Sequence, residues 1–528
     1  MQPVNHRPEE APPASKRLPP GKALALPGAL AIALVALGLL TRDPLFSRPI
    51  LGAAGVLVLW TAALYVTARR SGRTLGIEIV LRQHHYVQAC VLVVVFSYWG
   101  WHLPAVRLFA PMLLVQLIFA YGLHILLTWS RRDNYELGFG PVPITFSMNF
   151  FLLFKPEWFY WQFVMVALAF LAKELIRWKR DGHSMHIFNP SAFTLTVFSV
   201  VLILTGTTDR TLGVELATTL FNPPHIYAVI FLVSLTGQLL FGVATMTIAA
   251  VLTTYAFGLL YFAATGTYYF FDAYIPIAVF LGMHLLFTDP ATSPRSESGR
   301  ILFGVMYGLS VIGTYALLSA FGAPGFYDKL LPVPLMNLLV RVIDRAAASG
   351  RLRLLDFSKL GERLTPARRR VATVGLWVVL FAAISGARGL GDEHPGQYLP
   401  FWQEACEAGS ARACDYVPDM LGNFCEKDSG WACNELGVHL VQRESDRRTA
   451  LAAIRRGCEL GFPMACENVY RMTTGPETLG SEPPLIGDLP IVLRGSKGAI
   501  LERDPRALYA LACERGWPDT CGVQPVDP

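Results

Sequence analysis

Two polar segments interrupt an otherwise apolar chain, and their residue types are those that bind anions. The first, at 180–193, reads RDGHSMHIFNPSAF, and the second, at 288–300, reads TDPATSPRSESGR. In each, an Asn-Pro or Asp-Pro pair can start a helix, because the Asx side chain caps the first turn and proline suits its first position. A helix N-terminus that faces a membrane cavity attracts anionic groups such as phosphate. The same pattern also fits two well-capped connecting loops. The candidate binding residues are Asn189, Pro190, Thr288, Asp289, Pro290, Thr292, Ser293 and Arg300; no catalytic residue is identified.

Eight of the nine cysteines follow residue 400 and form four C-x7-C pairs. In three pairs a glycine lies three residues after the first cysteine, where it can end one helix in the left-handed conformation before the next begins. Each pair therefore straddles a helix corner, which can bring two Cα atoms within the roughly 7 Å that a disulfide requires. The alternative is a metal or redox role, but no C-x-x-C motif or other metal-ligand set supports it. The predicted disulfides are Cys406–Cys414, Cys425–Cys433, Cys458–Cys466 and Cys513–Cys521.

Four further ionisable residues lie in or beside apolar runs, where such residues are often functional. They are His124, His225, His284 and Glu174. A pair of histidines can bind haem axially, although no spacing here demonstrates a pair. The alternative is that each histidine ring bonds to a backbone carbonyl.

The composition indicates what positions these residues. The 528-residue chain is 53% hydrophobic and only 16% charged, with a mean hydropathy of +0.41, whereas soluble domains carry about 25% charged residues. This excludes a soluble single-domain enzyme and predicts an all-α polytopic membrane protein in the lipid bilayer. Residues 1–386 hold 31 Lys and Arg against 18 Asp and Glu, and residues 387–528 hold 14 against 21. Positive cytoplasmic loops account for the basic excess, so nucleic acid is not an expected partner.

Apolar runs predict about 11–12 spans. The first run is interpreted as an uncleaved span rather than a removed signal peptide. The proline-bounded run at 142–154 is interpreted as a broken or re-entrant helix. The predicted organisation is a disordered cytoplasmic tail at 1–22, two spans at 23–80, a membrane core at 81–325, a basic amphipathic linker at 326–370, a final span at 371–386 and a cysteine-rich helical repeat domain at 387–528.

Arginine clusters place the N-terminus and several loops in the cytoplasm. The stretch at 322–370 is also basic, yet simple counting puts it outside, so one crossing between 180 and 321 must be misassigned. The amphipathic piece Leu335–Ile343 is expected on the membrane surface. Disulfides require an oxidising compartment, which places the C-terminal domain in the periplasm or outside the cell.

The polar loops carry a family resemblance. FNPSAF and TDPATSP…GRILFG resemble the paired signatures of the RnfD/NqrB family of flavin-carrying membrane subunits, over roughly 80–325. This resemblance implies two inverted repeats of helices with flavin between them. The motifs QHHYVQA, ELIRWKRDG and FYDKLLPVP are most similar to the UnbU-like members, which are found with enediyne biosynthesis genes. The family attaches FMN to the Thr of an S-G-A-T motif, which is absent here, so covalent FMN is not expected. Non-covalent flavin, FMN or riboflavin, is the cofactor hypothesis.

The tail resembles cysteine-rich bacterial Sel-one-like repeats, relatives of tetratricopeptide repeats, at about 398–471 and 501–525. Stacked helix pairs present a concave surface, so a protein partner is expected there. Two hypotheses follow for a protein of the bacterial inner membrane. One is a subunit for membrane electron transfer or coupled ion or small-molecule transport. The other is a non-catalytic anchor or carrier that works mainly through its repeats.

Overall fold

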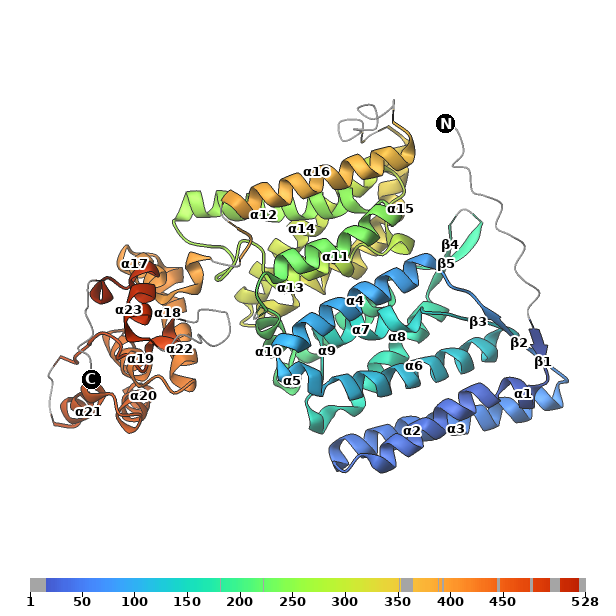
Figure 1. Ribbon diagram of the computed structural model, residues 1–528, viewed down its shortest axis with the longest axis horizontal. Coiled ribbons are helices and arrows are strands. Elements are labelled where there is room, and N and C mark those ends of the chain that lie inside the picture. The colour runs from blue at the N-terminus through green and yellow to red at the C-terminus, as the bar shows by residue number, and fades with distance from the viewer. Residues whose placement is uncertain are drawn as a thin grey trace. The chain divides into compact units, whose positions relative to one another are not determined.

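The protein is built almost entirely of helices, which confirms the predicted helical class (Figure 1). The computed structural model describes residues 16–180, 182–221, 223–350, 352, 364–387, 389–391, 394–443, 447–474, 478–493 and 504–521. The chain divides into two compact units. Unit 1 comprises the chain up to Thr254 together with Ile277–Ala383, and unit 2 comprises Tyr255–Pro276 and the chain from Ile384 onward.

Unit 1 is a helical bundle whose long helices are apolar. Six helices or helix pairs of the described chain are long and apolar enough to cross a membrane, which agrees with a polytopic membrane protein: Pro20–Leu40, Pro44–Arg70, Pro104–Arg131, Ala244–Thr265, Glu297–Ala320 and Pro366–Ala387. The helices that begin in unit 1 are α1 (Pro20–Ala23), α2 (Ala25–Leu40), α3 (Pro44–Arg70), α4 (Gln83–His102), α5 (Pro104–Leu108), α6 (Ala110–Arg131), α7 (Pro141–Phe151), α8 (Tyr160–Leu175), α9 (Pro190–Leu204), α10 (Gly213–Thr219), α11 (Ile226–Phe241), α12 (Ala244–Thr265), α13 (Ile277–Leu285), α14 (Glu297–Ala320), α15 (Pro332–Ala348) and α16 (Pro366–Ala387), with the 3-10 turns η1 (Pro156–Trp158), η2 (Thr208–Arg210), η3 (Pro290–Thr292) and η4 (Gly325–Lys329).

The upper predicted count of 12 spans treats every apolar run as a crossing, and the lower count of 11 leaves one run out. The runs at 142–154 and 273–287 form helices of only 11 and 9 residues, α7 and α13. A helix needs about 20 residues to cross a bilayer, so neither crosses alone. The core helix α7 is nevertheless buried along most of its length, which is why its sequence is as apolar as that of a span.

Two small sheets join the connecting loops at one end of unit 1 (Figure 1). The strand β2 (Leu75–Ile79) pairs antiparallel with β1 (Lys16–Leu18) and parallel with β3 (Asn134–Leu137). The strands β4 (Arg177–Arg180) and β5 (His183–His186) form a hairpin, and β5 lies in the first polar segment. The strand β1 falls within the segment predicted to be a disordered tail. Of that tail, residues 1–15 lie outside the described residues and residues 16–22 form β1 and the start of α1.

The segment from η4 through α15 runs back along α14. The Tyr307 hydroxyl donates to the Lys329 carbonyl at 3.0 Å, and the Asp344 carboxylate accepts from the Arg295 backbone N–H at 3.0 Å. Later residues of this segment thus contact earlier residues of the α14 region, so the two run antiparallel. The C-terminal part of α15 therefore lies at the end of the bundle that holds the second polar loop.

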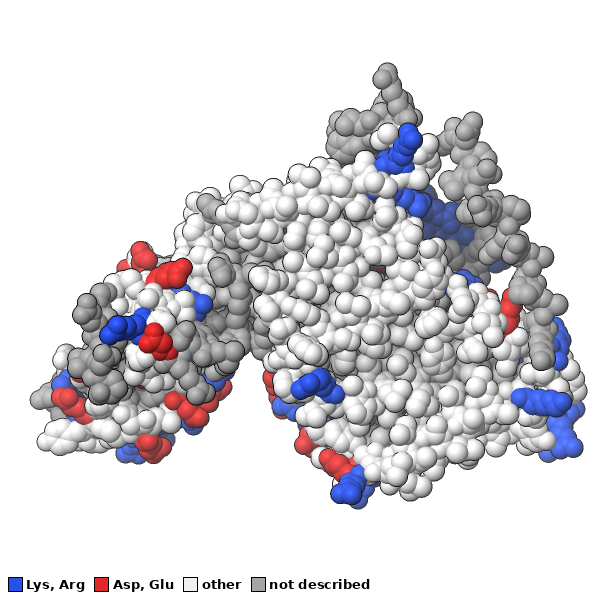
Figure 2. All heavy atoms as spheres, viewed as in Figure 1, with Lys and Arg blue, Asp and Glu red and all other residues white. Residues whose placement is uncertain are grey.

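The helix α15, which contains the amphipathic piece Leu335–Ile343, packs one of its faces against the bundle. Its residues at spacings of three and four, Val333, Met336, Val340 and Ile343, are buried. Figure 2 shows Lys and Arg of unit 1 concentrated at the end that carries the strands, with a nearly uncharged flank beside it. Hereafter this is called the basic end.

Unit 2 contains short helices joined by sharp corners. They are α17 (Leu399–Glu407), α18 (Ala411–Glu426), α19 (Gly430–Gln442), α20 (Arg447–Glu459), α21 (Pro463–Thr474), α22 (Leu489–Val492) and α23 (Pro505–Glu514), with the turns η7 (Pro395–Gln397) and η8 (Pro518–Thr520). The eight cysteines are joined in the four predicted pairs, with Cα–Cα distances of 4.6, 4.7, 4.6 and 4.8 Å in chain order.

The corners have the left-handed residue that the sequence predicted. Gly409, Gly461 and Gly516 have φ angles of 93°, 86° and 91°. In the remaining corner, where no glycine stands, Asp428 adopts the same conformation with φ of 67°. Closing a loop of this length contributes roughly 2–3 kcal/mol, so the bridges supplement a small core.

A loop predicted to belong to the membrane core groups with unit 2 instead. The ring of Phe271 stacks on that of Tyr416 with centroids 3.7 Å apart, and the Arg412 guanidinium lies over Phe271 at 4.8 Å from the ring centroid. The Gln397 side-chain amide donates to the Asp272 carbonyl at 3.0 Å. Aromatic packing therefore fixes the 266–276 loop to the first helices of unit 2.

Candidate functional site

The first polar loop is fixed by Asn189, which caps α9 as predicted. Its side-chain oxygen accepts from the Ala192 N–H at 3.2 Å and from the Ser191 hydroxyl at 2.8 Å. Its amide group donates to the Leu286 carbonyl, 2.9 Å away, at the end of α13. Pro190 occupies the first turn. Asn189 thus caps its own helix and ties the first loop to the second.

The second loop folds around Asp289, but the structure differs from the predicted helix start. The carboxylate accepts from the Ala291 N–H at 3.1 Å and from the Thr292 hydroxyl at 3.2 Å, and the Ser293 hydroxyl donates to the Asp289 carbonyl at 2.6 Å. After Pro290 the chain makes only the single 3-10 turn η3. These local hydrogen bonds satisfy the turn without continuing it into a helix.

The long helix after this loop has its own cap. The Ser296 hydroxyl accepts from the Gly299 N–H at 3.1 Å, and α14 begins at Glu297. Upstream, the buried Thr288 hydroxyl donates to the His284 carbonyl at 2.7 Å. Thr288 therefore holds the end of α13 rather than facing a ligand.

Asn337 of α15, which the sequence did not single out, joins both loops. Its side-chain oxygen accepts from the Asn189 backbone N–H at 3.0 Å, and its amide group donates to the Thr292 carbonyl at 3.4 Å. The side chain is buried, so these bonds are shielded from water. The sequence signal that could have identified Asn337 is a polar residue on the apolar face of an amphipathic helix.

Asp344, seven residues further on and so on the same side of α15, makes the second clamp. It accepts from the Arg180 guanidinium, which also donates to the Ser293 carbonyl at 3.2 Å. Arg180 is only 7% exposed, so its charge is neutralised by Asp344 inside the protein. The two loops and α15 therefore form one bonded layer at the basic end.

A cavity of about 80 Å³ lies between the two loops and the helices α4, α7 and α8. Two of its chemical features stand out, a cluster of imidazoles and one carboxylate. Within the described residues, no group of three or more His, Cys, Asp or Glu side chains is arranged to hold a metal ion. The ionisable residues that line the cavity are His84, His85, Lys173, His186 and Asp289, joined by the polar residues Gln88, Ser147, Asn189 and Ser191.

These ionisable groups come from four separate elements and face one another. The His186 Nε2 atom lies 3.6 Å from the Asp289 carboxylate, and the rings of His84 and His85 have centroids 4.2 Å apart. A Cβ atom added at Gly140 would lie 3.5 Å from His85 Nδ1 and 3.6 Å from Lys173 Nζ, so these two groups approach the same point. Three imidazoles and one ammonium group thus surround a single carboxylate.

Asp289 is the group whose charge the cavity controls. Burial raises the pKa of its carboxyl, but the hydrogen bond and charge of His186, with the Ala291 N–H, outweigh burial and lower the pKa below its ordinary value. The carboxylate is therefore ionised over the whole physiological range. It supplies a fixed negative charge beside the His186 imidazole.

The remaining predicted residues have structural roles. The Arg300 guanidinium donates to the Gly242 carbonyl at 2.7 Å and to the Pro294 carbonyl at 3.1 Å, and pairs with Glu297 at 3.1 Å. It holds the start of α14 and does not line the cavity, so it does not act as the predicted anion ligand there. Asn189, Pro190 and Asp289 line the cavity, whereas Thr288, Pro290, Thr292, Ser293 and Arg300 do not.

The ionisable residues of the apolar runs lie elsewhere. The His284 Nδ1 atom is 2.7 Å from the Phe280 carbonyl, which matches the expected bond to a backbone carbonyl. His124 Nε2 lies 3.9 Å from the Glu174 carboxylate, which also pairs with Arg132. His225 is exposed and precedes α11 in a left-handed conformation. The site residues His84, His85 and His186 belong to recognisable motifs, but nothing in their spacing linked them.

A flavin does not fit between the two signature loops. Sites for drug-sized ligands and cofactors enclose about 300–1,000 Å³, whereas this cavity encloses about 80 Å³. The cavity has room for a few water molecules or a small ion.

Comparison with known proteins gives no relative for this chain. No family model, no curated protein and no solved structure matches it.

Proposed function

We propose that this protein is an RnfD/NqrB-like membrane subunit for ion-coupled transport, in which the charged cavity takes up and releases protons. The observation that supports this is the convergence of His84, His85, Lys173 and His186 on Asp289. Ionisable groups inside membrane proteins commonly form proton relays. A cavity that holds a few waters can connect them.

The geometry of the site supports a proton relay with two parts, the His186–Asp289 pair and the adjacent rings of His84 and His85. The carboxylate of Asp289 lies 3.6 Å from Nε2 of His186. The adjacent rings of His84 and His85 line the same cavity. The positive charge of Lys173 in that cavity disfavours protonation of two imidazoles at once. A proton on one imidazole therefore weakens proton binding by the others, which favours transfer over retention.

The charge distribution supports an orientation for this function. In a bacterial inner membrane the basic end of unit 1 would face the cytoplasm, where Arg370 donates to the Leu240 carbonyl at 3.0 Å. The helix α16 would carry the chain from there across the membrane. Unit 2, with its disulfides, would lie in the periplasm or outside the cell and bind a protein partner through its stacked helices.

Proteoliposomes test the proposal directly. An imposed potassium diffusion potential should drive protons into vesicles that contain the full chain, reported by an internal pH-sensitive dye. Asp289→Asn keeps the cap oxygen but removes the charge and should lower the initial rate about tenfold. The matched control is Asp209→Asn in the exposed turn η2, which should conduct like the wild type. A wild-type rate equal to that of protein-free vesicles would refute proton transport.

A second candidate, a non-catalytic anchor working through unit 2, is favoured by the poor fit for flavin. Absorbance of the purified protein between 350 and 500 nm separates it from an electron-transfer subunit. A bound chromophore with redox-dependent absorbance would support electron transfer. An anchor would give neither a chromophore nor proton flux, yet would retain a partner through unit 2.

A further inference from the structure

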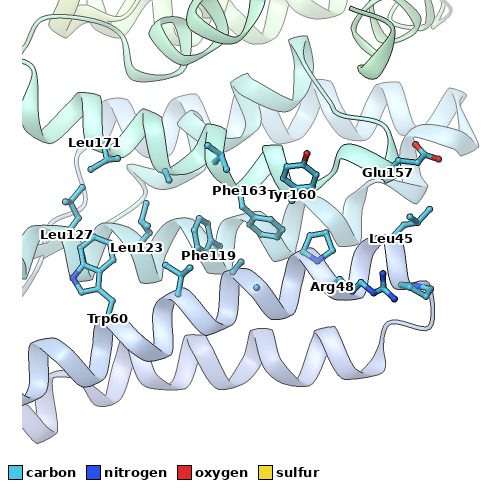
Figure 3. Close-up of a pocket in the computed structure, with 17 residues that line it drawn as sticks. Leu45, Arg48, Trp60, Phe119, Leu123, Leu127, Glu157, Tyr160, Phe163 and Leu171 are labelled. Carbon is cyan, nitrogen blue, oxygen red and sulfur yellow. The ribbon is translucent and has the colours of Figure 1, made fainter. Parts of the chain in front are cut away.

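A second and much larger hollow lies on the flank of unit 1, away from the charged cavity. It encloses about 800 Å³ between α3, α6 and the segment from η1 to α8. Figure 3 shows that apolar side chains form its walls, among them Phe119, Leu123 and Phe163. Its volume is in the range that holds a drug-sized or lipid-sized ligand.

The two charged residues of this groove lie together at one end. Figure 3 shows Arg48 of α3 and Glu157 of η1 there, on opposite walls, while Trp60, Leu127 and Leu171 lie at the other end. Both charged side chains are exposed, and neither forms an ion pair within the described residues. They are thus available to a ligand that carries both signs of charge.

The length of the groove matches one leaflet of a bilayer. Arg48 and Trp60 are twelve residues apart on α3, which corresponds to about 18 Å of helix, and half of a hydrocarbon core is about 15 Å. The polar edge of Trp60 is already satisfied, since its Nε1–H donates to the Ser130 hydroxyl at 2.9 Å. Only its apolar ring is left for a ligand, which suits the end of an acyl chain.

We infer that this groove binds a zwitterionic aminophospholipid, with its phosphate at Arg48, its ammonium group at Glu157 and one acyl chain along the apolar walls. A guanidinium group matches phosphate with paired hydrogen bonds, and a carboxylate matches an ammonium group. A lipid with a purely anionic head group would be repelled by Glu157. The inference does not rest on the proposed proton function, which involves other residues.

Native mass spectrometry of the delipidated full chain in detergent tests the inference. The probes are phosphatidylethanolamine and phosphatidylglycerol with identical acyl chains. We expect one saturable phosphatidylethanolamine site, weakened about tenfold by Arg48→Gln and by Glu157→Gln. Phosphatidylglycerol should bind less tightly, and Glu157→Gln should not weaken it. The control Arg42→Gln removes an exposed arginine that does not line the groove and should leave binding unchanged.

A second pair of variants tests the apolar part without altering charge. Gly52 lines the groove and a side chain there meets nothing within 4 Å, whereas Gly55 has equal room but does not line it. Gly52→Leu should abolish phosphatidylethanolamine binding, and Gly55→Leu should not, with both variants eluting as folded protein. Tighter binding of phosphatidylglycerol, equal binding of both lipids, or insensitivity to Glu157→Gln and Gly52→Leu would each overturn the inference.

Discussion

Asp289 has two separable roles, as a cap and as a charge. Its oxygen accepts the Ala291 N–H, which an asparagine can also do, whereas its negative charge faces His186. Asp289→Ala removes both and should cost about 0.5–2 kcal/mol for the cap alone. Asp289→Asn removes only the charge, so comparing the two variants separates folding from proton handling.

The lowered pKa of Asp289 predicts a pH-dependent stability. Because the folded state favours the carboxylate, its contribution is present above the unfolded pKa of about 3.9 and is lost as the pH falls through the lower folded value. Asp289→Asn should therefore lower the free energy of unfolding by about 1–2 kcal/mol at pH 6. The difference should begin to shrink near the unfolded pKa of about 3.9 and disappear only below the lower folded pKa. Thermal unfolding in detergent, followed by tryptophan fluorescence, measures this. A constant difference at every pH would contradict it.

A glycine at a disulfide corner has a conformational role. Gly461 has φ of 86° and a side chain there would meet nothing within 4 Å, so only backbone strain opposes substitution. Gly461→Ala should destabilise the protein by about 1–2 kcal/mol. The control is Gly422→Ala, also unobstructed but inside α18, which should stabilise by about 0.5–1 kcal/mol. Equal effects on thermal unfolding would show that the left-handed corner does not matter.

At the scale of elements, α14 and α12 pack through a G-x-x-x-G pattern. A Cβ atom added at Gly304 would lie 2.3 Å from the Met246 carbonyl oxygen, and one at Gly308 would lie 3.0 Å from that of Ala250. Such small residues let helix backbones approach closely in a membrane, where packing rather than water exclusion drives association. The apolar sequence alone gives no hint of which neighbour α14 approaches.

This contact predicts opposite behaviour for two glycines of the same helix. Gly304→Ala should separate α12 from α14 and cost about 1–3 kcal/mol, seen as a lower unfolding temperature and loss of monodispersity. Gly313→Ala meets nothing within 4 Å and should leave both unchanged or slightly improved. If both variants behave alike, the close contact is absent in the folded protein.

At the scale of the whole molecule, the proposed orientation predicts where thiol reagents act. In a Cys90→Ser background, which removes the one cysteine outside the disulfides, intact cells should react with a membrane-impermeant maleimide only after reduction. A Ser71→Cys control at the basic end should react only after lysis. Cysteines of unit 2 that become reactive only on lysis would place unit 2 in the cytoplasm and reverse the proposed orientation.

Some features of this protein were determined by local sequence. Apolar runs predicted the helices, and Asn189-Pro190 predicted the start of α9. The C-x7-C spacing predicted the four disulfides. Each depends on residues within one or two helical turns, so each can be inferred from spacing. Asp289-Pro290 failed as a helix start because hydrogen bonds within its own turn compete with the continued helix.

Only the tertiary structure decided the rest of the site. Asn337 lies 148 residues from Asn189, and His84 and Asp289 come from segments about 200 residues apart, so no local pattern relates them. A hydropathy profile averages over a whole helix, so it does not reveal that the chain runs back along α14 through η4 and α15. Asp328, Lys329 and Asn337 lower that average, although each is buried and satisfied by a partner. Long-range packing, rather than the polarity of the segment, determines where it runs.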